Sequence, residues 1–211
     1  RDTESRDLLL ACGVHGQDIH VSCDAGLSYL VTLHASMVSR DRRQPTITAC
    51  VNHRFGWTAE QTASFLDCCA SHFSARVVLV ALFPAADLEF TREVQRRLLS
   101  SSEVVVSPSV EALLQLCDTA CMIVAGRYHM AAAGVASGSP MVALAYDPKV
   151  AHLADALGFD VITPGALPEA AARLVLGTNP RCVPEDAAEC LVSLRGQRIQ
   201  RLQMALADLH Q

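Results

Sequence analysis

The chain is short of charged and aromatic residues. Of its 211 residues, 18% are charged and 5% aromatic, whereas 51% are hydrophobic. A chain this apolar can bury a core of ordinary size, which argues against intrinsic disorder. It also lacks a cluster of basic residues, and its formal net charge is −5. A nucleic-acid-binding surface is therefore not expected, because such surfaces gather lysine and arginine.

Long apolar runs and metal-ligand motifs are missing as well. The longest apolar stretch, 122–145, is interrupted by Arg127, His129 and three glycines, so it falls short of the roughly 18 residues of a membrane span. The nine cysteines include no CxxC pair and the eight histidines no HxxxH pair, so neither a metal nor an organic cofactor is expected. An odd number of cysteines, mostly within apolar segments, is typical of small buried residues in a reducing cytosol, and we expect a cytoplasmic protein.

Apolar segments alternate with segments of helical period from residue 46 onward. Strands are expected over 46–51, 75–83, 104–106, 121–125, 141–145 and 161–162. Helices are expected over 59–72, 87–99, 109–117, 129–136 and 150–157, and from 168 and 185 onward. Strands that are apolar throughout and are each followed by a helix indicate a parallel sheet covered on both faces. The fold class is therefore α/β, a Rossmann-like doubly wound sheet.

The first 44 residues fit this repeat poorly. They predict a helix over 1–13, a strand over 19–23, a helix or connection over 28–40 and a polar linker over 41–45. We expect three parts: a remnant of an N-terminal domain with its linker at 1–44, the Rossmann-like domain at 45–195, and a C-terminal helix at 196–211.

Local signals fix several helix ends. Thr58 and Gln61 have the spacing of a capping box, and Ser109 is a candidate N-cap. Gly158 is expected to end the helix before it, since glycine readily takes the left-handed conformation found there.

Two neighbouring strands are expected to end in polar motifs. Residues 126–129 read Gly-Arg-Tyr-His, and residues 146–149 read Tyr-Asp-Pro-Lys. The carboxyl ends of parallel strands meet at one edge, so Arg127, His129 and Lys149 should lie together. Residues 127 and 129 should share a face if the strand end is extended. Such a cluster suits a substrate with phosphate and carboxylate groups and an acid–base step.

Each of these three residues also has an ordinary structural interpretation. Arg127 could form an ion pair with Asp147 or Asp118, His129 could be a hydrogen-bonded core histidine, and Lys149 could simply begin a helix. Against this, Lys149 is the only lysine of the chain, in a sequence that otherwise uses arginine, which favours a chemical role for it.

Three further residues have two interpretations each, and a fourth is assigned to packing. Asp147 could orient Lys149 or cap the following helix. Trp57 could stack on a sugar or pack in the core, and Arg54, at another strand end, could contact substrate or form a surface ion pair. Tyr128 is assigned to packing, since it should point away from its neighbours.

Three motifs resemble those of the polysaccharide pyruvyl transferase family. They are Arg127-Tyr128-His129, the small-residue segment from Gly134 to Pro140, and the Tyr-Asp-Pro-Lys-Val run at 146–150. Weaker similarities to the family's other motifs fall at 1–13, 19–27, 52–57 and 83–87. Together the similarities extend over nearly the whole chain.

The resemblance implies an enzyme of two GT-B-like domains, with this chain mainly the C-terminal one. It implies transfer of the pyruvyl group of phosphoenolpyruvate to two hydroxyls of a sugar, as a cyclic ketal, with release of phosphate. The family's motif residues fall on Arg127, His129 and Lys149, the expected catalytic residues. Candidates for substrate binding are Arg1, Arg54, Tyr146 and Asp147.

The implied partners are the donor phosphoenolpyruvate and a sugar or lipid-linked saccharide acceptor of a cell-surface polysaccharide. A lipid-linked acceptor would bring peripheral membrane association, and an N-terminal domain would complete the cleft. Two other functions stay open. One is a GT-B glycosyltransferase that uses a nucleotide sugar, although the strand ends offer basic residues where a ribose would need an acidic one. The other is a non-catalytic domain that binds an anion or a glycan.

Overall fold

The computed structural model describes residues 3–16, 25–37 and 45–178. Several predicted features lie outside these residues: Arg1, the strand at 19–23, most of the linker at 41–45, the helix from 185 and the C-terminal helix at 196–211. The expected division into three parts therefore stays a prediction.

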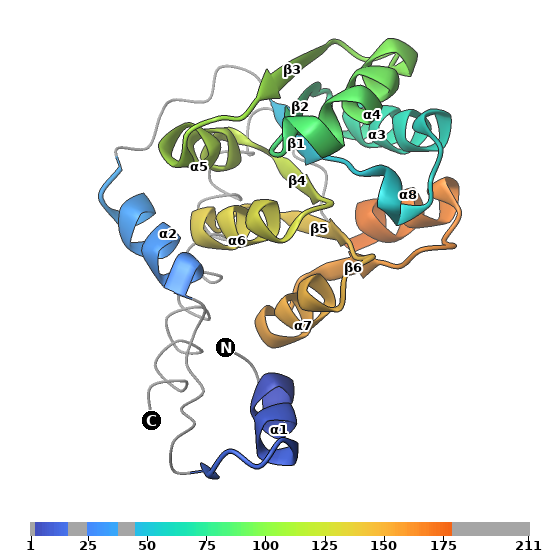
Figure 1. Ribbon diagram of the computed structural model, residues 1–211. Coiled ribbons are helices and arrows are strands. Elements are labelled where there is room, and N and C mark those ends of the chain that lie inside the picture. Colours follow the sequence, from blue (N-terminus) through green and yellow to red (C-terminus); the bar gives the residue numbers. More distant parts are fainter. Residues whose placement is uncertain (1–2, 17–24, 38–44, 179–211) are drawn as a thin grey trace.

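Six parallel strands form one sheet (Figure 1). They are β1 (Thr46–Cys50), β2 (Arg76–Ala81), β3 (Ser102–Val106), β4 (Met122–Ala125), β5 (Met141–Leu144) and β6 (Asp160–Ile162). Their order across the sheet is β3-β2-β1-β4-β5-β6, which reverses direction between β1 and β4. This is the order of a doubly wound Rossmann fold, so the predicted fold class is confirmed.

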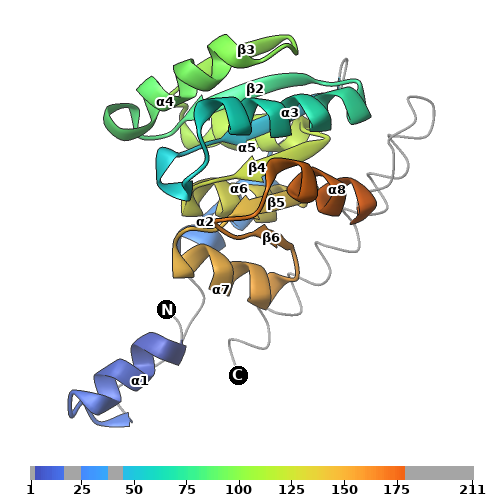
Figure 2. The same cartoon turned by 90° about the vertical axis from the view of Figure 1, so that its right-hand side faces the viewer.

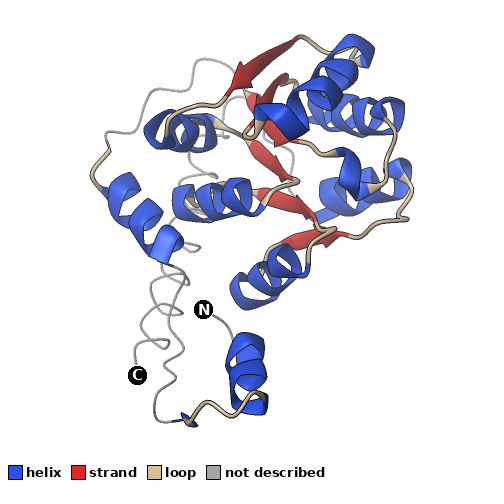
Figure 3. Cartoon of the chain, in the orientation of Figure 1, coloured by secondary structure: helices blue, strands red, loops and turns tan. Residues whose placement is uncertain are grey.

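Helices cover both faces of the sheet (Figures 2 and 3). On one face lie α3 (Ala59–Phe73), α4 (Pro84–Arg97) and α8 (Pro168–Thr178), and on the other lie α5 (Val110–Thr119), α6 (Tyr128–Ser137) and α7 (Pro148–Leu157). The central strands are buried on both sides, which explains why β4 and β5 are apolar throughout and why β1 carries only threonine as a polar residue.

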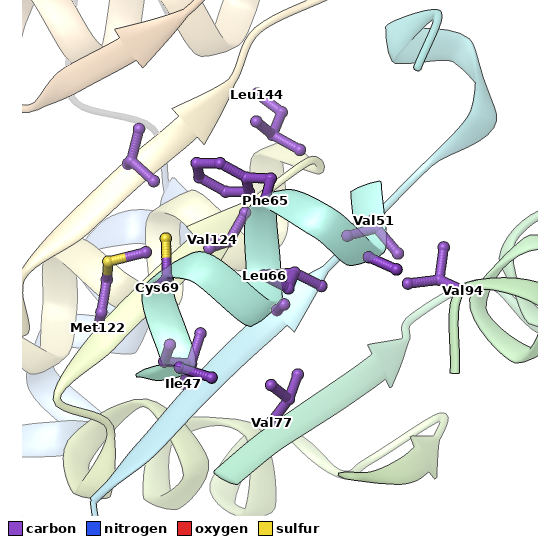
Figure 4. Close-up of a cluster of buried hydrophobic side chains, with 14 of the residues drawn as sticks. Ile47, Val51, Phe65, Leu66, Cys69, Val77, Val94, Met122, Val124 and Leu144 are labelled. Carbon is purple, nitrogen blue, oxygen red and sulfur yellow. The ribbon is translucent and has the colours of Figure 1, made fainter. Parts of the chain in front are cut away.

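The larger core lies between the sheet and α3 (Figure 4). Phe65, Leu66 and Cys69 of α3 are essentially inaccessible and pack on side chains of the central strands. Trp57 belongs to the same core: it is 6% exposed, and its Nε1 donates to the Ala166 carbonyl at 2.8 Å. The packing interpretation of Trp57 is therefore the correct one.

The three helix ends predicted from capping residues are confirmed. The Thr58 hydroxyl accepts from the Gln61 N–H at 3.1 Å, and the Gln61 side chain accepts from the Thr58 N–H at 2.9 Å, so the capping box of α3 is complete. The Ser109 hydroxyl accepts from the Ala112 N–H at the start of α5. Gly158 ends α7 in the left-handed conformation, with φ of 68°.

Three helices, α4, α6 and α7, begin earlier than the sequence pattern predicts; α7 starts at Pro148 rather than 150. Helix α4 starts at Pro84 rather than 87, because proline suits the first helical position and the Asp87 carboxylate accepts from the Phe83 N–H at 3.1 Å. Helix α6 starts at Tyr128, directly after Arg127. The prediction that residues 127 and 129 share a face of an extended strand end is therefore wrong.

The N-terminal part of the chain contributes two helices to the described structure. Helix α2 (Ala25–Ala35) takes up most of the described part of the segment left open at 28–40. It packs mainly against α6 and also against α5. His34 Nε2 lies 3.4 Å from Asp118 Oδ1 in this contact. Helix α1 (Thr3–Ala11) lies apart from the sheet in both views (Figures 1 and 2).

Candidate functional site

A cavity of about 340 Å³ lies at the carboxyl edge of the sheet. Its walls come from the segments that follow β2, β4 and β5 and from helices α2 and α6. The lining residues are Gly26, Leu27, Leu30, Phe83, Arg127, Tyr128, His129, Ala132, Tyr146, Asp147 and Lys149. The cavity thus brings together all three predicted catalytic residues and two of the predicted substrate-binding residues. Ligands of doubly wound sheets bind at this edge.

Arg127 is the N-cap residue of α6 and is held by an ion pair. Its Nη2 contacts Oδ1 of Asp87, and its side chain is 15% exposed. The partner is thus Asp87, rather than Asp147 or Asp118, the two carboxylates considered from the sequence. Burial works against the charge of Arg127, but the hydrogen bond and the charge of Asp87 outweigh it and raise the arginine pKa above its ordinary value. Arg127 is therefore a permanent cation.

Asp87 is fully buried at the start of α4 and has three donors. Besides Arg127, its Oδ1 accepts from Asn52 Nδ2 at 3.4 Å, and its Oδ2 accepts from the Phe83 N–H. Asn52 in turn accepts from the Arg54 N–H at 2.8 Å. This polar network joins the ends of β1, β2 and β4. Arg54 is placed at the same edge, but its exposed side chain does not line the cavity.

Phe83 lies between two of the predicted catalytic residues. Its ring centroid is 5.2 Å from Arg127 Cζ and 5.8 Å from the centroid of the His129 ring. The Phe83 side chain is 45% exposed. It therefore forms an aromatic wall beside a guanidinium and an imidazole.

His129 and Lys149 are both exposed to the cavity from first turns of helices. His129 is an exposed residue of α6, so the alternative of a buried core histidine is wrong. Lys149 is exposed in α7, and Asp147 caps that helix by accepting from the Lys149 N–H at 2.9 Å. The cap interpretation of Asp147 is confirmed, and the same bond fixes the backbone that carries Lys149. Tyr128, assigned to packing, contacts the small cluster around Ala143 and also lines the cavity.

The N-termini of helices α6 and α7 lie at this cavity. The side chain of Arg127 makes no capping hydrogen bond to the first turn of α6, while α7 is capped by Asp147. The first-turn N–H groups and the helix dipole favour an anion at such a position. Together with a guanidinium and an ammonium, the arrangement suits a small ligand with several negative charges.

Gly126 allows β4 to approach β1 closely before the arginine. Its N–H donates to the Cys50 carbonyl at 2.7 Å, and a Cβ at Gly126 would lie 2.6 Å from that oxygen. A larger residue would displace the backbone that leads into Arg127. The glycine of the motif at 126–129 therefore has a steric role. Burial, with the charge of Asp87 acting in the same sense, raises the pKa of the neighbouring Cys50 thiol to about 12, so this thiol stays protonated.

Sequence reasoning missed Asp87, Phe83, Leu27 and Leu30 as parts of the site. Phe83, Asp87 and Leu27 fall only within weak motif similarities, at 83–87 and 19–27, and the separation of 40 residues between Asp87 and Arg127 gives no local pattern. The two leucines belong to α2, whose approach to α6 is a tertiary contact.

The described residues give two further negative findings. They contain no group of three histidine, cysteine, aspartate or glutamate residues that could hold a metal ion. In the same ranges, every helix is too short or too polar to cross a membrane.

The sheet order defines a Rossmann-like domain, and the cavity lined by Arg127 and Lys149 at its carboxyl edge is its candidate ligand site. The chain belongs to the polysaccharide pyruvyl transferase family, whose model matches residues 1–148. The match includes Arg127 and His129 and ends one residue before Lys149. No curated protein matches the chain.

Several solved structures, glycosyltransferases among them, are similar to this chain at low identity. The glycosyl transferase family 9 protein of Veillonella parvula is 14% identical with a TM-score of 0.45, over 90% of this chain and 54% of that one. WaaG, a glycosyltransferase of lipopolysaccharide biosynthesis, is 14% identical with a TM-score of 0.49, over 88% of this chain and 48% of its own. Anabaena Alr3699/HepE, solved with UDP-glucose, is 13% identical with a TM-score of 0.49, over 99% and 61%. The chain thus spans less than two thirds of each of these proteins.

Proposed function

We propose that this chain carries the donor site of a transferase that moves the pyruvyl group of phosphoenolpyruvate onto a sugar of a cell-surface polysaccharide, as a cyclic ketal. The family supports the reaction class. The observation that carries the proposal is that Arg127, His129 and Lys149 line the same cavity. Such a site suits phosphoenolpyruvate, which has close to three negative charges on a small molecule.

Arg127 and Lys149 have complementary roles toward the donor. A guanidinium can hold a carboxylate or phosphate through two parallel hydrogen bonds, whereas an ammonium acts as a point charge. The N-terminus of α6 adds backbone donors from the same side. Leu27 and Leu30 supply an apolar wall, against which the uncharged methylene of the donor can lie.

His129 is the general acid in this proposal. Its proton goes to the methylene carbon of phosphoenolpyruvate, which leaves a cation at the neighbouring carbon, stabilised by the attached oxygen. One sugar hydroxyl adds to that carbon and gives its proton back to the imidazole of His129. A second hydroxyl then bonds to the same carbon and passes its proton to the phosphate oxygen as the bond between that oxygen and the carbon breaks, so hydrogen phosphate leaves and the ketal ring closes. His129 is exposed to the cavity, as a proton donor must be.

The acceptor and its setting are part of the proposal. A sugar or a lipid-linked saccharide would enter from the open side of the cavity, and a lipid-linked one would draw the protein to a membrane surface. A second GT-B-like domain would close over both substrates. The proposed reaction takes place in the cytoplasm and needs neither a metal nor an organic cofactor.

Replacing His129 tests the proposed chemistry. His129→Gln removes the proton donor and leaves the cations of Arg127 and Lys149 in place, so turnover should fall roughly 10²–10⁴-fold while most of the affinity for phosphoenolpyruvate is kept. Phosphate release in the presence of acceptor measures turnover, and calorimetry with phosphoenolpyruvate measures affinity. Near-normal turnover would remove His129 from this role. Binding of nucleotide sugars without binding of phosphoenolpyruvate would favour the glycosyltransferase alternative.

A further inference from the structure

We propose that Asp87 is a positioning residue that fixes the guanidinium of Arg127 for contact with the anionic donor. This inference rests on the proposed function, because it takes phosphoenolpyruvate as the ligand of the cavity. Asp87 itself does not line the cavity, so its effect must pass through Arg127.

The contacts of Asp87 fix the orientation of its carboxylate. The residue is 0% exposed, and both carboxylate oxygens are used. Oδ1 faces Arg127 Nη2 and Asn52 Nδ2, and Oδ2 faces the Phe83 N–H. These donors come from the start of α6, the end of β1 and the residue before α4, so three separate parts of the sheet edge hold the carboxylate in place.

The guanidinium of Arg127 is held from two sides. Asp87 contacts one of its terminal nitrogens, and the ring of Phe83 lies 5.2 Å from its central carbon. An arginine side chain on the surface samples many rotamers and loses that freedom on binding a ligand. The side chain of Arg127 is already restricted in the folded protein, so less conformational entropy is lost when the donor binds.

Asp87 also has an opposite, purely electrostatic effect. A carboxylate beside the cavity repels an anion, and it offsets the charge of Arg127. If that were its main effect, its removal would tighten the binding of phosphoenolpyruvate. If positioning is its main effect, removal weakens binding. The sign of the change therefore separates the two roles.

A double-mutant cycle with Asp87→Asn and Arg127→Met tests this. Asparagine keeps the size of the side chain and an oxygen for the Phe83 N–H. We expect Asp87→Asn to weaken phosphoenolpyruvate binding about tenfold in the native background. In the Arg127→Met background it should change affinity by less than about twofold, because the residue it positions is gone. Calorimetry gives both affinities.

Glu89→Gln is the matched control. It removes one carboxylate from the same helix α4, but from an exposed position, and should leave the affinity unchanged. Tighter or unchanged binding by Asp87→Asn overturns the positioning role, and so does an equal loss in both backgrounds. If native protein binds no phosphoenolpyruvate, the proposed function fails instead, and with it the ligand on which this inference rests.

A second variant keeps the test decisive if Asp87→Asn does not fold. Arg127→Lys retains the charge beside Asp87 but loses the planar fork. If the orientation of the fork matters, this variant should lose affinity about as far as Arg127→Met. Native-like affinity in Arg127→Lys would show that charge alone is sufficient and would overturn the proposal.

Discussion

At the scale of single residues, the site depends on close contacts that tolerate little change. Gly126 is the clearest example. A Cβ there would lie 2.6 Å from the Cys50 carbonyl oxygen, a backbone atom that cannot move without shifting β1. Arg127 follows directly, so the steric requirement at Gly126 and the placement of the cation are linked.

Replacing Gly126 should therefore cost stability. We expect Gly126→Ala to lower the free energy of unfolding by about 1–3 kcal/mol, the usual cost of an overpacked site, and to weaken phosphoenolpyruvate binding as well. Chemical denaturation and calorimetry measure the two effects. Gly134→Ala is the control. Its Cβ would meet side-chain atoms of Met141 and Ile123, which can move, rather than a backbone atom. Equal losses in both variants would contradict the steric account.

At the scale of elements, the sequence predicts strands and helix caps well. These features depend on residues that are close together in the chain. The structure contains the apolar strand β2 and the caps at Thr58 and Ser109 as predicted. The start of α6 could not be predicted in this way. Whether residue 128 is extended or helical depends on where β4 ends against β1, which is a contact between distant segments.

The cap of α7 gives a prediction at this scale. Asp147→Ala removes the acceptor for the Lys149 N–H and should lower the free energy of unfolding by about 0.5–2 kcal/mol. Asp147→Ser can still cap the helix and should restore most of that loss. Urea denaturation of the two variants measures the difference. If the Asp147→Ser and Asp147→Ala variants lose equal stability, the cap does not stabilise α7.

At the scale of the whole molecule, sequence order and spatial order differ. The alternation of strands and helices predicts a doubly wound sheet, and the placing of Arg127, His129 and Lys149 at one edge follows from that fold. The cavity could not be predicted in the same way. Helix α2, about a hundred residues before α6 in the chain, forms one side of it. Neither Leu27 nor Leu30 has a sequence feature that predicts this.

Because the cavity is formed only in the folded chain, its ligand should stabilise the whole fold. Phosphoenolpyruvate at a hundred times its dissociation constant should raise the free energy of unfolding by about 2.7 kcal/mol. Thermal unfolding at increasing phosphoenolpyruvate concentration measures this as a rising midpoint. Sulfate at equal ionic strength is the control for a general salt effect. A midpoint that rises equally with both anions would count against a specific donor site.

The pairing of Asp87 with Arg127 changes how the cavity acts on a molecule that is still in solution. Seen from several ångströms away, opposite charges in contact nearly cancel, and what remains is a weak dipole. Among the residues that line the cavity, long-range attraction of an anion then falls to Lys149, the chain's single lysine, which is exposed in the first turn of α7, and the nearby carboxylate of Asp147 offsets part of it. In the proposed reaction Arg127 acts only at contact distance, so capture and alignment of the donor would be divided between two side chains from adjacent strand ends.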